Sequence, residues 1–375
     1  MGNVAKRPDG RWRARYRGPD RRERSKHFDR KIDAEKWLAS VSVATDRGEW
    51  VDPQRSAVLL SDWADEWLGG QQHLKPSTHA RYAGLLRRHV VPGFGALRLS
   101  DVGHSAVQSW VADLTRQGLA AATVRQAHRV LHLVLDLAVR DGRIARNPAA
   151  RVKMPRAARP EKRYLMHDQV HALADECGRY RTAVLVMAYS GLRFGELAAL
   201  RVRDVDLMRR RATVRESVTT IGSKLVAGTP KSHQQREVPL PAFLAESLAE
   251  ELAGREPESL AFPAPRGGYL RNSVFRTHFF DSAATRVGLN GLTPHELRHT
   301  AASLAISSGA SVKVVQRMMG HASAAMTLDV YAGLFADDLD TVAERLDTHG
   351  RAAAVARADQ VRTSSVVTPL RTGTK

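Results

Sequence analysis

Four short segments in the second half of the chain combine residue types that could carry out chemistry on a phosphate ester. They are residues 191–197 (GLRFGEL), 228–232 (GTPKS), 293–299 (TPHELRH) and 319–331 (MGHASAAMTLDVY). Two of them carry an arginine, Arg193 and Arg298. A pair of guanidiniums can offset the negative charge of a phosphodiester without a metal ion. Arg298 follows His295 by three residues, which places both on one face of a helix. The pattern indicates phosphoryl transfer.

The remaining reactive residues supply the other roles that such a transfer needs. Tyr331 can form a transient covalent link to phosphorus, although a tyrosine with a pKa of about 10 needs positive charge or a base nearby. Lys231, on an expected turn between two strands, can donate a proton to the leaving oxygen. His295 and His321 can transfer protons or hydrogen-bond the phosphate. Each of these residues alone is more often a packing or surface residue, so the prediction rests on their joint order.

A competing motif overlaps the third segment. Residues 295–299 spell H-E-x-x-H, in which His295 and His299 would bind zinc one helical turn apart and Glu296 would act as a general base. This interpretation predicts a metalloprotease, with His321 as the candidate third ligand. It leaves the first arginine, the lysine and the tyrosine unexplained, and it does not account for the charge of the chain.

Charge is the strongest global signal in the composition. The 375 residues carry a formal net charge of +19 and a pI of about 10.7, which favours a polyanionic partner such as nucleic acid. An arginine-rich genome would produce the same bias. The single cysteine, Cys177, excludes an internal disulfide and a multi-cysteine zinc site. There is no run of about 18 apolar residues and no apolar N-terminal segment, so we expect a cytoplasmic protein without a membrane span.

Residues 164–345 are expected to form the mixed α/β domain that positions the reactive segments. A nearly continuous apolar helix is predicted over residues 180–189, directly before Arg193. Residues 212–218 and 236–240 are typical of strands, and helices are expected from Pro241, Ser273 and Pro294. The end of the chain, residues 346–375, is expected to be a loose tail.

Residues 56–150 are predicted to form a compact helical domain. Ser61 and Thr123 are placed to begin helices, Pro76 fits a first helical turn, and Asp141-Gly142 fits a helix end. A basic, proline-rich linker is expected over residues 151–163. Its candidate DNA contacts are Arg151, Lys153 and Arg156. A solvated hinge without DNA contacts is an equally good interpretation of this segment.

Residues 1–55 are predicted to form a separate small module of a β-sheet and one helix. Residues 6–31 hold 12 basic and four acidic residues. In a strand, Trp12, Ala14 and Tyr16 would share one face, and an arginine comb would cover the other: Arg11, Arg13, Arg15 and Arg17. Asp33 is expected to cap the helix. The comb suits a DNA groove, and the alternative is a solvated charged strand.

Together these segments resemble the tyrosine recombinase family, specifically phage-type integrases, over nearly the whole chain. The family order of Arg, Lys, His-x-x-Arg, His and Tyr is matched by Arg193, Lys231, His295 with Arg298, His321 and Tyr331. Flanking residues match as well, including Ser190-Gly191-Leu192 and Gly320-His321, the latter ten residues before the tyrosine. Glu296 stands where many relatives have Asp, and Glu196 and His299 are expected to support the catalytic residues. A DNA-binding protein with an inactive site and a type IB topoisomerase are the alternatives with the same residue types.

The resemblance implies a reaction, a fold and partners. Tyr331 would attack the scissile phosphate and leave a 3′-phosphotyrosine and a free 5′-hydroxyl, and neither ATP nor a metal would be needed. The expected fold is multidomain and mainly α-helical with small β-sheets. The helical core-binding domain and the catalytic domain would form a C-shaped clamp, and residues 1–55 would be an arm-site module. The expected partner is double-stranded attachment-site DNA in a bacterial host, bound by four protomers that are monomeric when free. Whether the reaction also needs a DNA-bending accessory protein or a directionality factor is left open by the sequence.

Overall fold

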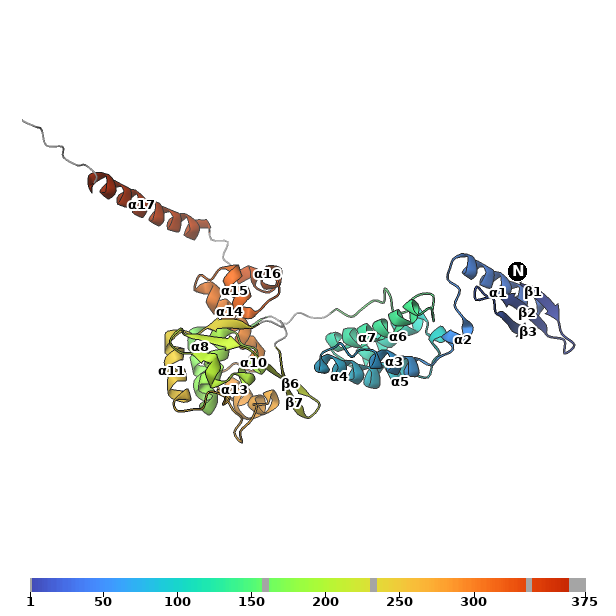
Figure 1. The fold of residues 1–375 in the computed structure, drawn as a ribbon, viewed down its shortest axis with the longest axis horizontal. Helices are drawn as coiled ribbons and strands as arrows, with labels where there is room; N and C mark the ends of the chain where they lie inside the picture. Colours follow the sequence, from blue (N-terminus) through green and yellow to red (C-terminus); the bar gives the residue numbers. More distant parts are fainter. Residues whose placement is uncertain (1, 157–161, 230–234, 335–338, 364–375) are drawn as a thin grey trace, which may run out of the picture. The chain divides into compact units, whose positions relative to one another are not determined.

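The protein divides into two compact units (Figure 1). One comprises Met1–Glu161 with Thr220–Lys224, and the other comprises Lys162–Thr219 with Leu225–Lys375. The computed structural model describes residues 2–156, 162–229, 235–334 and 339–363. Helices predominate, and the strands form small antiparallel sheets, as the sequence predicts.

The first unit begins with a three-stranded antiparallel sheet and one helix. These elements are β1 (Asn3–Lys6), β2 (Trp12–Arg17), β3 (Glu23–Phe28) and α1 (Lys31–Asp46). The alternation in β2 is confirmed, because Ala14 and Tyr16 are buried on the side of the sheet that packs against α1. Asp33 does not cap the helix as expected. It lies in the first turn and pairs with Arg30, which occupies the N-cap position.

A second, purely helical core follows in the same unit. Its elements are α2 (Pro53–Ser56), α3 (Leu60–Gly69), α4 (Pro76–Leu85), the π-helix Leu86–Val90, α5 (Val91–Phe94), the 3-10 turn Leu99–Asp101, α6 (His104–Arg116) and α7 (Ala121–Arg140). α7 buries Val124, Leu131 and Leu135 at helical spacing. Ser61 lies inside α3 and Thr123 inside α7, so neither begins its helix as expected: the first turns start at Leu60 and Ala121.

Residues 151–155 lie against this helical core. Gln108 on α6 exchanges two hydrogen bonds with the backbone of Lys153, at 2.9 and 3.2 Å. The guanidinium of Arg125 on α7 donates to the carbonyl oxygen of Pro155 at 2.8 Å. Because these backbone groups have partners on two helices, the first part of the predicted linker belongs structurally to the helical core.

The second unit is built around one buried helix, α9. Its helices are α8 (His167–Glu176), α9 (Arg181–Ser190), α10 (Phe194–Ala199), α11 (Ala242–Leu252), α12 (Asn272–Phe275), the π-helix Arg276–Phe280, α13 (Asp281–Arg286), α14 (Pro294–Ser307), α15 (Val312–Met319) and α16 (Ala324–Tyr331), with short 3-10 turns at Gly178–Tyr180, Val202–Asp204 and Ala332–Leu334. Every residue from Thr182 to Ala188 is buried, because α8, α11 and α14 pack around α9. Cys177 is buried beside this core.

The strands of the second unit form two small antiparallel sheets. They are β4 (Val205–Asp206), β5 (Arg211–Val214), β6 (Ser217–Ile221), β7 (Lys224–Gly228) and β8 (Arg236–Pro239). The order is β4-β5-β8 in one sheet and β6-β7 in the other. The strand predicted over residues 212–218 is therefore two strands in different sheets, and the chain changes sheet at residues 215–216.

The described part of the expected loose tail, residues 346–363, is helical, and residues 364–375 lie outside the described residues. Residues Leu339–Thr363 form a long helix, α17. Small, helix-favouring alanines and an ion pair one turn apart, between Asp347 and Arg351 at 2.7 Å, support it. Among the helices of the described residues, none is long and apolar enough to cross a membrane.

Candidate active site

An ion-pair network of three residues lies where α9 ends and α10 begins. Arg193 occupies the N-cap position of α10, and its guanidinium lies 2.9 Å from the buried carboxylate of Glu196. Arg236, the first residue of β8, approaches the same carboxylate at 2.6 Å. Burial alone would raise the pKa of Glu196, but hydrogen bonds and charge from Arg236 and Arg193 hold that pKa below its ordinary value. Glu196 therefore stays ionised and orients two arginines.

The second predicted arginine, Arg298, is held by backbone oxygens. It lies on α14, is 3% exposed, and donates to the carbonyl oxygens of Gly191 and Met319. Burial, followed by the charge of Arg193, lowers the pKa of Arg298 to about 9, so it remains a cation at neutral pH. An incoming anion such as a phosphate would stabilise a buried cation held in this way.

Tyr331, the last residue of α16, is buried within a small apolar cluster. The residue is 2% exposed and packs with Ala301, Val315 and Met319. Its hydroxyl lies 2.8 Å from Nδ1 of His299. Burial raises the pKa of Tyr331 to about 12, and the charge of Arg298 only partly offsets this effect. The tyrosine is therefore neutral in this arrangement, and its hydroxyl is hydrogen-bonded to His299.

The predicted histidines surround the tyrosine. The ring of His321 stacks on that of Tyr331, with centroids 6.5 Å apart and an interplanar angle of 10°, and its Nδ1 lies 3.0 Å from the Thr327 hydroxyl. His295 meets His299 edge to face at 5.0 Å. Burial, with nearby positive charge, lowers the pKa of both His299 and His321 to about 4. Both are neutral at pH 7 and can accept or donate one hydrogen bond at each nitrogen.

The geometry around the H-E-x-x-H motif does not favour a zinc site. Glu296 accepts hydrogen bonds from the backbone nitrogen and hydroxyl of Thr293, at 2.7 and 3.0 Å, and so caps α14. Nδ1 of His299 is engaged by Tyr331. Within the part of the chain that the structure describes, no three His, Cys, Asp or Glu side chains are grouped to hold a metal ion.

Comparison with known proteins identifies one family over most of the chain. Residues 163–337 match the phage integrase family, residues 60–154 match the phage integrase central domain, and residues 1–47 match the phage integrase N-terminal domain. The prophage phiRv2 integrase of Mycobacterium tuberculosis is 31% identical over 349 residues, which cover 88% of this chain and 90% of that protein. The chain belongs to the phage integrase family of tyrosine recombinases.

Other similarities agree with this family. The tyrosine recombinase XerC of Mycobacterium bovis is 31% identical over 78% of this recombinase and 99% of its own length. In fold, a Tn1549 transposon integrase bound to a circular intermediate DNA superposes with a TM-score of 0.67 at 20% identity, over 77% of this chain and 99% of that one. A lambda integrase dimer bound to a core site superposes with a TM-score of 0.58 at 19% identity, and the match covers 89% of this chain and 95% of that one.

The family defines the reaction. This recombinase is a site-specific DNA strand-transfer enzyme, which cleaves and rejoins strands through a 3′-phosphotyrosine intermediate and so integrates or excises DNA. Membership of this family favours strand transfer over the metalloprotease interpretation of the H-E-x-x-H motif.

The structure brings most of the predicted reactive residues into one place. Contacts and electrostatic interactions link Arg193, Glu196, His295, Arg298, His299, His321 and Tyr331. Lys231 lies outside the described residues. Sequence reasoning missed Arg236, whose only signal was its position at the start of a strand soon after the GTPKS segment.

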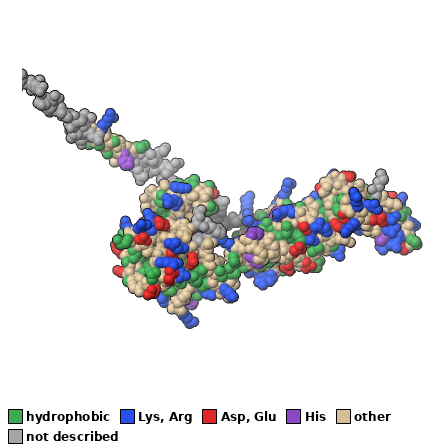
Figure 2. Space-filling view, in the orientation of Figure 1, with side chains coloured by type: hydrophobic (Ala, Val, Ile, Leu, Met, Phe, Trp, Pro, Cys, Tyr) green, Lys and Arg blue, Asp and Glu red, His purple; other side chains and the backbone are tan. Residues whose placement is uncertain are grey.

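The predicted DNA contacts lie in the first unit. Arg11 and Arg15 are partly neutralised by ion pairs with Asp29 and Glu23, at 3.1 and 3.5 Å, while Arg17 is exposed. Nε of Arg13 is buried without a hydrogen-bond partner. Arg151, Lys153 and Arg156 are all exposed. In the view of Figure 2, Lys and Arg side chains are spread among acidic ones on both units.

Proposed function

We propose that Tyr331 is the nucleophile of the recombinase and that Arg193 and Arg298 bind the scissile phosphate. The observation that carries the proposal is the position of the Tyr331 hydroxyl, beside His299 and His321 and in the field of Arg298. The tyrosine oxygen attacks phosphorus as its proton passes to a neighbouring neutral histidine, the bond from phosphorus to the 5′-oxygen breaks, and a 3′-phosphotyrosine forms. Lys231 gives the 5′-oxygen its proton. His295 and His321 hydrogen-bond the phosphate.

Glu196 and Arg236 act as positioning residues in this proposal. The carboxylate of Glu196 holds the Arg193 guanidinium at 2.9 Å and the backbone nitrogen of Arg193 at the same distance. Arg236 also donates to the carbonyl oxygen of Met318, 3.2 Å away, next to the oxygen that Arg298 binds. The ion-pair network thus orients Arg193 directly and holds the backbone next to the group that Arg298 binds.

This arrangement of the tyrosine is a resting state. With a pKa of about 12 for Tyr331 and about 4 for His299, the proton strongly favours the tyrosine oxygen. Tyr331 is also only 2% exposed, so its protonated oxygen is enclosed by protein and is not presented to a phosphate in this arrangement. We infer that DNA binding moves Tyr331 out of this contact and towards the phosphate.

We propose further that the whole chain acts as a tetramer on double-stranded attachment-site DNA in the cytoplasm of a bacterial host. A solved lambda integrase tetramer bound to a Holliday junction, with a TM-score of 0.57, 18% identity, and 86% of this chain and 96% of that one covered, supports this assembly. The first sheet, through Arg11, Arg13, Arg15 and Arg17, would bind distal arm sites. The helical core, through Arg151, Lys153 and Arg156, would bind the crossover site.

Replacing Tyr331 with phenylalanine tests the nucleophile. Tyr331→Phe should bind crossover-site DNA as tightly as the wild type and form no covalent adduct, because only the attacking oxygen is lost. Adduct is measured on a denaturing gel with an end-labelled suicide substrate. The control is Tyr180→Phe, which removes the hydroxyl of another buried tyrosine, one that donates to Pro263 in the same unit. An adduct with the Tyr331 variant would contradict the assignment.

A further inference from the structure

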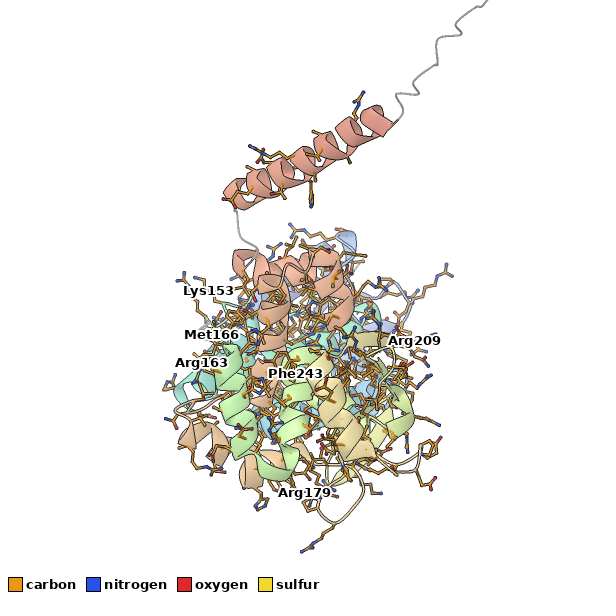
Figure 3. All side chains as sticks on the ribbon, turned by 90° about the vertical axis from the view of Figure 1, so that its left-hand side faces the viewer. Lys153, Arg163, Met166, Arg179, Arg209 and Phe243 are labelled. Carbon is orange, nitrogen blue, oxygen red and sulfur yellow. The ribbon has the colours of Figure 1, made fainter. Side chains whose placement is uncertain are left out.

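Four consecutive residues at the start of the second unit contact the helices that carry the candidate active site. These residues, 162–165, are called the junction strap. The first two are the last residues of the predicted linker (151–163), and the strap directly precedes Met166, the N-cap residue of α8. Arg163 and Met166 are labelled in Figure 3, where they lie near each other on one edge of the second unit.

The first strap residue, Lys162, contacts the end of the nucleophile's helix. Its ammonium nitrogen donates to the carbonyl oxygen of Val330 at 2.8 Å, although the two residues are 168 positions apart in sequence. The same nitrogen lies 5.9 Å from the centroid of the Tyr331 ring, within the range of a cation–π contact. Lys162 therefore interacts with Tyr331 and with the peptide group directly before it.

The other strap residues anchor the segment to α14. Arg163 donates to the carbonyl oxygen of Asn290 at 2.8 Å and lies 3.8 Å from Glu296, which caps α14. The backbone nitrogen of Leu165 donates to the buried hydroxyl of Thr300 at 3.2 Å. Tyr164 packs against the apolar cluster that contains Tyr331. Because α14 also carries Arg298 and His299, the strap is fixed to the same helix as the resting partner of the tyrosine.

We propose that the junction strap is a positioning element for the nucleophile, and that Lys162 restrains Tyr331 in its resting position. Lys162 stabilises only the arrangement in which the Val330 carbonyl and the Tyr331 ring lie beside the strap. A displacement of Tyr331 towards DNA breaks both contacts. Any shift of the linker that moves Lys162 is therefore transmitted to the tyrosine. The proposal rests on Tyr331 being the nucleophile, as proposed above.

The restraint predicts a gain in cleavage rate when the Lys162 donor is removed. Lys162→Met keeps the length of the side chain and removes its charge and hydrogen bonds. The rate of adduct formation at saturating protein should rise about three- to tenfold, which corresponds to the net worth of roughly one hydrogen bond. The Kd for the same DNA should be unchanged. Lys162→Arg, which retains a donor, should restore a rate close to that of the wild type.

The experiment measures single-turnover adduct formation and Kd separately, with full-length protein and a suicide substrate that carries the crossover site. Arg286→Met is the matched control, because Arg286 also ties two helices through a backbone carbonyl, that of Glu176, at a distance from the strap in sequence. The proposal would be overturned if the cleavage rate of Lys162→Met were unchanged or lower than that of the wild type. A higher Kd for DNA would also overturn it, because Lys162 would then be a DNA contact. The assignment of Tyr331 as the nucleophile is tested separately: the wild type should form the covalent adduct and Tyr331→Phe should not.

Discussion

At the scale of single residues, the candidate site depends on charges that are buried and paired. Glu196 is 2% exposed and Arg298 is 3% exposed, positions at which an unpaired charge is strongly disfavoured. Two arginines neutralise Glu196. The hydrogen bonds of the Arg298 guanidinium within the described residues go to backbone carbonyl oxygens, which carry no net negative charge. The site is thus electrostatically incomplete in a way that an anionic phosphate would complete.

The two neutral histidines predict how stability depends on pH. His299 and His321 have pKa values of about 4 in the folded protein, because of burial first and nearby cations second. An unfolded histidine has a pKa of about 6.5, so the unfolded chain binds more protons below that pH. The stability of the folded protein is therefore unaffected by these two histidines above about pH 6.5. Between about pH 6.5 and 4 they lower the free energy of unfolding, because the unfolded chain takes up protons that the folded chain does not. The melting temperature measured from pH 7 to pH 4 should fall accordingly.

Substitution separates these histidines from the carboxylates, which also titrate in acid. His299→Gln and His321→Gln should each flatten the decline of Tm between about pH 6.5 and 4.5, the range in which an unfolded histidine takes up its proton. His278→Gln, at an exposed histidine of the same unit, controls for the loss of a histidine as such. If both site variants keep the wild-type slope, the two histidines are not held neutral by the fold.

At the scale of elements, the junction between α9 and α10 sets the position of both phosphate-binding arginines. α9 ends at Gly191, which adopts a left-handed conformation with a φ of 69° and gives its carbonyl oxygen to Arg298. Two residues later, Arg193 is the N-cap residue of α10. A Cβ at Gly191 would also lie 2.2 Å from the terminal methyl of Met319. The position therefore favours glycine for its backbone conformation, and a larger residue would also have to displace the end of the Met319 side chain.

Gly191→Ala should lower both stability and cleavage. The left-handed backbone costs an alanine about 1 kcal/mol, and the Met319 side chain must also move away from the added methyl group, beside the backbone that Arg298 binds. Chemical denaturation and the single-turnover cleavage rate measure the two effects. Gly309→Ala is the matched control, because Gly309 has a φ of 84° and a Cβ added there would meet no atom within 4 Å. Equal losses in the two variants would show that packing at Met319 has no role.

At the scale of the whole molecule, the N-terminal sheet continues structurally into the segment after α1. Trp50 donates to the Tyr16 hydroxyl at 3.2 Å and lies beneath Arg24, whose guanidinium also pairs with Asp52 at 2.8 Å. Residues up to 52 are therefore attached to the sheet, whereas Ser56 is buried with the helices that follow.

Deletion of residues 1–52 should separate two DNA-binding activities. The truncated protein should retain binding and cleavage at the crossover site and lose binding to distal arm sites. Arm binding by the full chain should have a salt dependence of about 0.9 per neutralised phosphate. Mobility-shift assays at several salt concentrations measure both, with the crossover site as the internal control. Unchanged affinity and slope on arm DNA would assign the sheet to protein contacts instead.

The sequence by itself determined the reactive residue types, their order and most of the elements that carry them. Helical periodicity is local, so α7, α9 and α14 could be placed from residue spacing, and Ala14 and Tyr16 could be assigned to a buried strand face. The motif order was specific enough to predict a tyrosine recombinase, which the similarity to the phage integrase family confirmed.

Only the tertiary structure decided which residues meet. The contact between Glu196 and Arg236 spans 40 positions, that between His299 and Tyr331 spans 32, and that between Lys162 and Val330 spans 168. None of these separations leaves a periodic signal, because each pair is joined by the packing of elements that are distant in the chain. The same reason explains why Arg236 was overlooked and why the burial of Tyr331 beside a neutral histidine could not be read from its motif.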